Sequence, residues 1–125
     1  MNKPFSIMGR ANSFRYAFAG IWTLLKTQHN MRIHAVAAAT VTGTGFCFGL
    51  SRIEWCMVVF AIANVWAMEA FNTAIESLAD RVSSDYHPLI KMAKDVAAAA
   101  VLFTATGAAI VGAIVFVPHL VKLSP

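Results

Sequence analysis

The chain has 125 residues, of which 58% are hydrophobic and only 13% are charged, and its mean hydropathy is +0.64. Soluble domains contain roughly 45–50% apolar and about 25% charged residues, and a chain this short cannot enclose so many apolar side chains in a core of its own. This composition excludes an ordinary soluble protein and indicates a lipid environment. The formal charge of +4 comes from Lys and Arg residues scattered singly, which favours juxtamembrane positions over a nucleic-acid partner.

The first expected element is a helix over residues 13–27. Its apolar side chains recur at three- and four-residue steps, and Ser13 is the expected N-cap. Tyr16 and Trp22 suit the boundary between lipid and water. The pattern predicts an amphipathic helix that lies in the membrane interface, although it also fits a helix that only packs against the rest of the chain.

Three stretches poor in charge follow and predict three transmembrane helices, at about 32–51, 55–82 and 92–120. The uncharged run at 55–68 is too short to cross a bilayer alone, but residues 69–82 keep helical spacing and contain neither Gly nor Pro. We therefore expect one long helix, partly embedded and partly projecting. The expected fold is an all-α membrane protein formed by a single domain over residues 1–125.

The positions of Lys and Arg predict the orientation in the membrane. Five of the ten precede the first expected span, whereas the connection to the second span carries only Arg52. Because cytoplasmic segments are enriched in Lys and Arg, the N-terminus is expected in the cytoplasm. Arg81, Lys91 and Lys94 place the next connection on the same side, so three spans leave the C-terminus outside.

A row of polar side chains lies along the long middle helix. It consists of Glu69, Asn72, Thr73, Glu76 and Asp80. Their spacing places them on one face of an α-helix. Carboxylates in a membrane are costly and point to function, their oxygens suit a hard divalent cation, and a carboxylate left free can act as a general base. The alternative is that these groups are polar contacts between helices.

A second polar patch lies in residues 83–95, SSDYHPLIKMAKD. Pro88 is expected to end the preceding helix and the next helix to begin near residue 90. The patch supplies Asp85, His87, Lys94 and Asp95. Lys94 suits phosphate recognition and Asp95 suits a metal or hydrogen-bond partner. Taken alone, the lysines fit the cytoplasmic excess of positive charge; beside the carboxylate face, they predict a nucleotide site. The chain has no GxxxxGK[ST] or GxGxxG loop and no CxxC or HExxH zinc motif.

Residues 69–102, EAFNTAIESLADRVSSDYHPLIKMAKDVAAAAVL, resemble the signature region of the small bacterial integral-membrane diacylglycerol kinase family, which includes the undecaprenol kinases. The resemblance extends back through NMRIH at 30–34 and SRIEW at 51–55 and covers nearly all of the chain past residue 13. The combination of NTAIE, Asp80, YHPL and AKD makes it specific. The strings NMRIH, SRIEW, YHPLIK and AKDVAA resemble the undecaprenol kinase branch of the family more than its diacylglycerol branch.

The resemblance implies an ATP-dependent lipid kinase that uses Mg²⁺. It implies a homotrimer in the bacterial cytoplasmic (inner) membrane, with active sites formed between neighbouring protomers. Glu69 matches the general base that activates the hydroxyl of a membrane lipid alcohol, Glu76 matches the ligand of the metal bound with ATP, and Asn72 and Asp80 support the site. The positions implied to hold nucleotide are Tyr16, Glu76, Asp85, His87, Lys94 and Asp95. Undecaprenol is the favoured acceptor and diacylglycerol the second.

The chain departs from the family at Gln28. The family usually has a metal-binding glutamate four residues before the arginine of the NMRIH-type motif, whereas an amide oxygen can coordinate a metal but carries no charge. We therefore expect weaker metal binding, compensation by another oxygen, or reduced activity. Two further functions stay open: a small ion or proton conductor that uses the carboxylate face as a relay, and a scaffold or decayed kinase.

Overall fold

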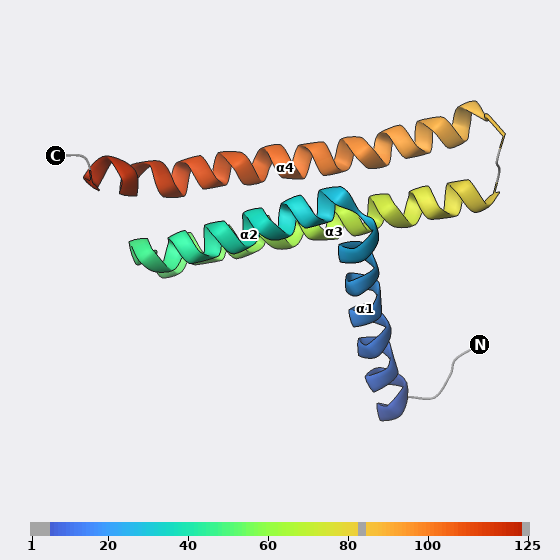
Figure 1. Ribbon diagram of the computed structural model, residues 1–125, viewed down its shortest axis with the longest axis horizontal. Helices are drawn as coiled ribbons and strands as arrows, with labels where there is room; N and C mark the ends of the chain where they lie inside the picture. The colour runs from blue at the N-terminus through green and yellow to red at the C-terminus, as the bar shows by residue number, and fades with distance from the viewer. Residues whose placement is uncertain (1–5, 83–84, 124–125) are drawn as a thin grey trace.

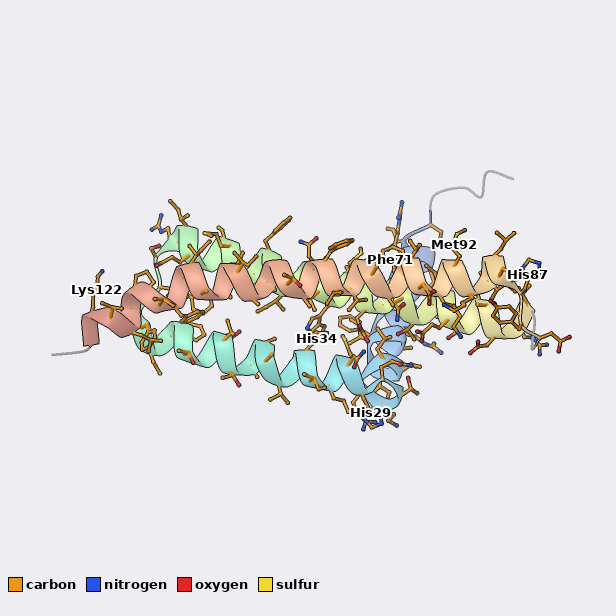
Figure 2. The ribbon with its side chains drawn as sticks, turned by 90° about the horizontal axis from the view of Figure 1, so that it is seen from above. His29, His34, Phe71, His87, Met92 and Lys122 are labelled. Carbon is orange, nitrogen blue, oxygen red and sulfur yellow. The ribbon has the colours of Figure 1, made fainter. Side chains whose placement is uncertain are left out.

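The computed structural model describes residues 6–82 and 85–123, which form four helices (Figure 1). In chain order these are α1 (Ile7–Thr27), α2 (His29–Phe48), α3 (Arg52–Val82) and α4 (Pro88–Leu123). Helices α2, α3 and α4 run side by side, and α1 leaves them at a steep angle, at the corner marked by His29 (Figures 1 and 2). The all-α class expected from the sequence is confirmed.

Two of the described helices are long and apolar enough to cross a membrane, Arg52–Val82 and Pro88–Lys122. Only 17% and 6% of the residues in their most apolar windows are buried, whereas the core helix of a soluble protein is mostly buried. The remaining expected span, residues 32–51, corresponds to α2, which has 20 residues and carries Arg32 in its first turn. The expected boundaries shift by a few residues, and α4 begins at Pro88, a favoured first helical position.

Helix α1 begins earlier than expected. Ser6 has an extended backbone, with φ −136° and ψ 124°, and its Oγ accepts a hydrogen bond of 3.3 Å from the backbone N–H of Gly9, which is the geometry of an N-cap. Ser13 lies inside the helix and donates its hydroxyl to the carbonyl of Gly9 at 3.0 Å. The expected N-cap at Ser13 was therefore wrong, because its hydroxyl bonds back to the preceding turn.

An arginine stabilises the corner between α1 and α2. Gln28 separates the two helices with an extended backbone of φ −102° and ψ 119°. Arg32 donates from Nε to the carbonyl of Leu25 at 2.9 Å and from Nη2 to the carbonyl of Lys26. These carbonyls belong to the last turn of α1, where carbonyl groups have no hydrogen-bond donor within the helix. The helix dipole also favours a cation at this end. The contact directs α1 across the other helices.

The turn between α2 and α3 is short and capped on both sides. Gly49 adopts a left-handed conformation, φ 66° and ψ 50°, and the N–H of Leu50 donates to the carbonyl of Gly45 at 3.2 Å. On the other side, Ser51 and Glu54 form a reciprocal capping box, with bonds of 2.7 and 3.3 Å between backbone N–H groups and side-chain oxygens. The turn makes α2 and α3 antiparallel neighbours.

Candidate active site

The buried stripe of α3 changes from apolar to polar halfway along the helix. Its four buried residues are Val58, Val65, Glu69 and Asn72. This spacing keeps them on one side of the helix. Glu69 is 2% exposed and Asn72 is 9% exposed, and they are the buried polar or charged residues of the part of the chain that the structure describes. The predicted polar face is therefore directed into the protein at its first two members.

Two oxygen atoms of this pair have no hydrogen-bond partner among the described residues. They are Oε2 of Glu69 and Oδ1 of Asn72, and both are buried. The amide nitrogen of Asn72 donates to Oε1 of Glu76 at 3.2 Å, so its carbonyl oxygen is turned away from Glu76. A buried acceptor without a donor costs about 1–3 kcal/mol, so this arrangement indicates a ligand or partner that fills the site.

A charge pair connects α3 to α4 near the end of the polar face. Nζ of Lys94 lies 3.0 Å from Oδ1 of Asp80, and these side chains are 14 positions apart in the sequence. Asp95 instead pairs with Lys91 one turn earlier on α4, where both side chains are largely exposed. Lys94 thus faces α3, whereas its neighbour Asp95 is held on an exposed side of α4.

The segment before α4 helps to start that helix. The carbonyl of His87 accepts the N–H of Lys91 at 3.0 Å, and its Nδ1 accepts the N–H of Leu89 at 3.3 Å. Both bonds satisfy donors in the first turns of the helix. Asp85 is exposed just before it. Residues 83–84 of the predicted patch lie outside the described residues.

Two of the predicted positions, Tyr16 and Gln28, form no hydrogen bond with the carboxylates of α3 among the described residues. Tyr16 is 69% exposed and lies 11 residues before the end of α1 at Thr27, or about 16 Å along the helix. Gln28 lies at the α1–α2 corner, where its Nε2 donates to Oγ1 of Thr27 at 3.3 Å. Within the ranges 6–82 and 85–123, no group of three or more His, Cys, Asp or Glu side chains could hold a metal ion.

The donor chemistry at the polar face nevertheless fits magnesium. Mg²⁺ is usually held by one or two carboxylates, together with water and substrate phosphates, rather than by a cage of protein ligands. Glu69 and Glu76 supply carboxylates one helical repeat apart, and Asn72 supplies an unpartnered amide oxygen between them. A metal that arrives bound to a nucleotide needs only a few of its ligands from the protein, because phosphates and water supply the rest.

The sequence analysis missed two features of this helix. Trp66 lies three residues before Glu69, and its Nε1 is also buried without a partner among the described residues; the three-residue spacing is the signal that could have found it. Glu54 pairs with His119, with 2.9 Å between Oε1 and Nε2. These two residues are 65 positions apart, so no sequence spacing could have predicted the pair.

These features define an all-helical protein with apolar helices and a buried carboxylate–amide pair on one of them. Comparison with known proteins gives the family: the family model for prokaryotic diacylglycerol kinase matches residues 15–116. The chain belongs to this family, as its resemblance indicated. The expectation of a lipid kinase family of membrane proteins is thereby confirmed.

Individual relatives align with most of the chain. An undecaprenol kinase from Bacillus subtilis (strain 168) is 42% identical over 108 residues, which cover 86% of this chain and 88% of the relative. A diacylglycerol kinase from Synechocystis sp. is 40% identical over 112 residues, which cover 89% of this chain and 64% of the relative. A diacylglycerol kinase from Haemophilus influenzae is 28% identical over 101 residues, which cover 81% of this chain and 86% of the relative.

Proposed function

We propose that this protein transfers the γ-phosphoryl group of MgATP to the hydroxyl of a membrane lipid alcohol, with undecaprenol favoured over diacylglycerol. The observation that carries this proposal is the buried carboxylate of Glu69, whose Oε2 has no partner among the described residues. A carboxylate held in this way can accept the proton of a hydroxyl during phosphoryl transfer. The similarity to an undecaprenol kinase at 42% identity supports the choice of acceptor.

The other residues of the polar face position the reacting groups. Glu69 takes the proton from the lipid hydroxyl, and Asn72 orients Glu76 through the 3.2 Å hydrogen bond. Glu76 and the free oxygen of Asn72 would hold Mg²⁺, which neutralises charge on the phosphates when it is bound. Lys94, which Asp80 places at 3.0 Å, supplies a positive charge for the transferring phosphate.

We also propose that each active site is shared between protomers of a homotrimer. Tyr16, Asp85, His87 and Asp95 are the remaining positions proposed to hold the nucleotide. Asp95 is directed to an exposed side of α4, and Tyr16 lies on the exposed helix α1. A neighbouring protomer could bring such residues to the Glu69 face, because exposed side chains are available to another chain.

The proposed location is the bacterial inner membrane, with α2, α3 and α4 as spans and α1 in the cytoplasmic interface. The steep departure of α1 from the other helices supports this arrangement (Figure 1). Helices α3 and α4 have 31 and 36 residues against 20 in α2, and they continue past the α1–α2 corner. Their extensions would project into the cytoplasm, where ATP is found, with the N-terminus inside and the C-terminus outside.

A radiolabelled ATP assay with two acceptors tests the proposal. Purified protein in mixed micelles is supplied with undecaprenol in one sample and diacylglycerol in another, with and without Mg²⁺. We expect label in lipid only when lipid alcohol and Mg²⁺ are both present, with higher kcat/KM for undecaprenol. If neither alcohol is labelled across a range of Mg²⁺ concentrations, the kinase proposal fails; ion flux into proteoliposomes without ATP would then favour a conductor.

Replacing the proposed base tests its role. We expect Glu69→Gln to lower kcat by about 10²- to 10⁴-fold, because general base catalysis contributes this much and the amide cannot accept the proton. Glu54→Gln is the matched control on the same helix, since Glu54 lies at the opposite end beside His119, and it should retain turnover. Size-exclusion and melting profiles check that both variants fold. Full turnover in Glu69→Gln would remove Glu69 from the mechanism.

A further inference from the structure

The direction of α1 depends on the corner at which this helix meets α2. No residue of α1 is buried, and its half-buried residues, Leu24 and Leu25, both lie in its last turn. Figure 1 shows the rest of α1 leaving the other helices at a steep angle. A membrane surface would keep such a helix in the plane of the interface but would leave it free to swing within that plane. The contacts at the corner therefore set its direction.

Three consecutive carbonyl groups at the end of α1 are bonded to the corner. The carbonyl of Leu24 accepts the backbone N–H of Gln28 at 2.8 Å. The next two, those of Leu25 and Lys26, accept from Nε and Nη2 of Arg32, the first of them at 2.9 Å. One side chain in the first turn of α2 thus supplies donors to two carbonyls that no longer have a donor within α1.

The geometry of a guanidinium makes this contact directional. Its donors lie in one plane and in a fixed fork, so two bonds to consecutive carbonyls restrain the angle between α1 and α2 as well as their distance. The basic residue in the last turn of α1 is engaged elsewhere: Nζ of Lys26 lies over the ring of Trp22, 4.8 Å from its centroid. Arg32 is therefore the cation that connects the end of α1 to α2.

We propose that Arg32 is a positioning residue of the active site, which holds α1 at the angle at which Tyr16 reaches a bound nucleotide. The inference rests on the proposed kinase function, in which Tyr16 helps to hold ATP. Tyr16 lies about 16 Å along α1 from the corner, so a swing of about 20°, the size of a sharp helix kink, would move it by about 6 Å. A misplacement of about 1 Å can already cost an enzyme about 10²-fold in rate.

An arginine at the membrane interface could instead bind the phosphate of a lipid headgroup. The two bonds to Leu25 and Lys26 favour the corner, because Nε and Nη2 already donate to carbonyls there and the end of a helix attracts a cation. Both experiments below use a neutral detergent without phospholipid, which offers no headgroup phosphate. An effect of Arg32 that persists in this detergent belongs to the corner.

Distances between spin labels test the contact without ATP or a lipid substrate. The labels are attached through Asn12→Cys on α1 and Ala39→Cys on α2, both at exposed positions, in a protein whose two native cysteines are replaced by alanine. Labelled chains are diluted with unlabelled ones, so that the measured pair lies within one chain. We expect a narrow distribution of distances, and we expect Arg32→Gln to broaden it or to shift it by several Å.

The matched control is Arg52→Gln, which removes an exposed arginine from the first turn of α3 and should leave the distribution narrow. Arg32→Lys keeps the charge but has no planar fork. We expect its distribution to lie between those of the wild type and Arg32→Gln.

Kinetics with the same variants test whether the angle of α1 matters for the reaction. With undecaprenol as acceptor, we expect Arg32→Gln to raise the KM for MgATP by about tenfold or more, because Tyr16 is displaced. At saturating ATP, kcat should change much less, since Glu69 and Lys94 lie on α3 and α4; such a split is typical of lost binding. Arg32→Lys should again be intermediate, and Arg52→Gln should resemble the wild type.

Three results would overturn the proposal. One is an unchanged distance distribution in Arg32→Gln, and another is a changed distribution with the KM for MgATP of the wild type. The third is an Arg32→Lys protein that equals the wild type in both experiments, since a charge without the fork would then suffice; this comparison decides alone if Arg32→Gln does not fold. Absence of lipid phosphorylation by the wild type contradicts the kinase function instead, and the distances still decide whether Arg32 holds α1.

Discussion

One hydrogen bond, from Asn72 to Glu76, determines which way the side-chain oxygen of Asn72 faces. Because Asn72 donates its amide to Glu76 at 3.2 Å, its Oδ1 must face the opposite way, and this atom stays buried without a partner among the described residues. A protein that only needed to glue two helices together would satisfy such atoms with each other. Two acceptors left free beside each other on one helix face instead suit a cation or a donor that arrives with the substrate.

Gln28 is the residue at which the charge of the proposed metal site can be tested. We expect Gln28→Glu to lower the Mg²⁺ concentration for half-maximal activity by several-fold, because a carboxylate adds a charge where the amide has only a dipole. The substitution removes the 3.3 Å bond from Nε2 to Thr27, which is exposed and contributes little. Initial rates measured over a Mg²⁺ titration at fixed ATP check this expectation.

The control for this titration is Gln28→Ala, which removes the Thr27 contact without adding charge. If Gln28→Ala and Gln28→Glu shift the Mg²⁺ dependence equally, the effect comes from the helix corner and residue 28 is not a metal ligand. If neither variant shifts the Mg²⁺ dependence, residue 28 does not contribute to metal binding, contrary to the expectation from the family resemblance.

At the scale of helices, the α2–α3 turn depends on a close approach at Gly45. A Cβ built on Gly45 would lie 2.9 Å from Cδ1 of Leu50 and 2.9 Å from the indole ring of Trp55. The leucine tip can move, but the indole is rigid and is also packed against Phe46, with 4.8 Å between ring centroids. The absence of a side chain at Gly45 is therefore what lets the capped turn fold back against α2.

We predict that Gly45→Ala destabilises the protein while Gly43→Ala does not. The first substitution overpacks the turn, which costs about 1–3 kcal/mol, whereas a Cβ at Gly43 meets nothing within 4 Å and Ala favours the helix by about 1 kcal/mol. Unfolding in mixed detergent micelles, followed by circular dichroism, measures both. Equal stability of the two variants would show that Leu50 and Trp55 rearrange at no cost.

A second contact at the same end joins α3 to α4. His119 lies 2.9 Å from Glu54 and stacks on Phe48 of α2, with 5.7 Å between ring centroids, so one imidazole joins α4 to both α2 and α3. The remaining packing here is apolar, around the buried residues Leu50, Val58 and Val115. The pair thus supplies a specific polar link within an otherwise nonspecific cluster.

A double-mutant cycle tests this link. We expect Glu54→Ala and His119→Ala each to lower the midpoint of detergent-induced unfolding, and the double variant to lose clearly less than the sum, because residues in direct contact are not additive. Phe103→Ala, at an exposed position of α4, combined with Glu54→Ala provides an additive reference. Strict additivity of Glu54→Ala and His119→Ala would mean that the 2.9 Å contact contributes nothing to stability.

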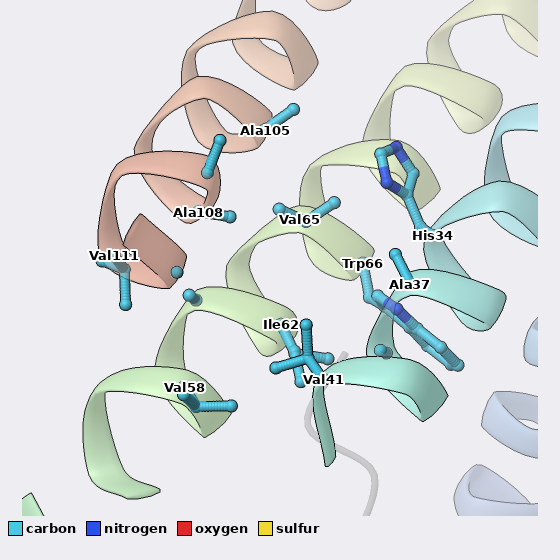
Figure 3. Close-up of a pocket in the computed structure, with 14 residues that line it drawn as sticks. His34, Ala37, Val41, Val58, Ile62, Val65, Trp66, Ala105, Ala108 and Val111 are labelled. Carbon is cyan, nitrogen blue, oxygen red and sulfur yellow. The ribbon is translucent and has the colours of Figure 1, made fainter. Parts of the chain in front are cut away.

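Over the whole molecule, periodicity predicted what each helix contains and missed what joins the helices. The length of α3 and its polar face follow from spacing within one segment. The sequence was therefore sufficient to place Glu69, Asn72 and Glu76 on one face of a helix. The pairs Lys94–Asp80 and Glu54–His119 join segments 14 and 65 positions apart. Such contacts depend on how helices pack, and so does the groove of about 300 Å³ that α2, α3 and α4 line together (Figure 3).

The arrangement of charged side chains in one chain bears on the proposal that active sites are shared between protomers. Glu69 of α3 is 2% exposed, whereas Asp95 pairs with Lys91 on an exposed side of α4. Consecutive helical positions differ by about 100° in direction, so Lys94 can face Asp80 while Asp95 cannot. If Asp95 and Glu69 serve one reaction, we propose that Asp95 serves the site of a neighbouring protomer.

Subunit mixing tests this proposal. Glu69→Gln and Asp95→Asn proteins are each expected to be inactive, but when they are unfolded together and reassembled in detergent, some mixed sites should contain the native Glu69 of one chain and the native Asp95 of another. Phosphorylation of undecaprenol should then clearly exceed the summed rates of the two proteins reassembled separately. As a control, two variants of the same buried face, Glu69→Gln and Asn72→Ala, should not complement each other. Both residues lie on the same helix of one chain, so no mixed site contains the native Glu69 together with the native Asn72. No recovery in the Glu69→Gln and Asp95→Asn pair would assign Glu69 and Asp95 to the site of a single chain, and recovery in the control pair would show that mixing restores activity by some other route than shared sites.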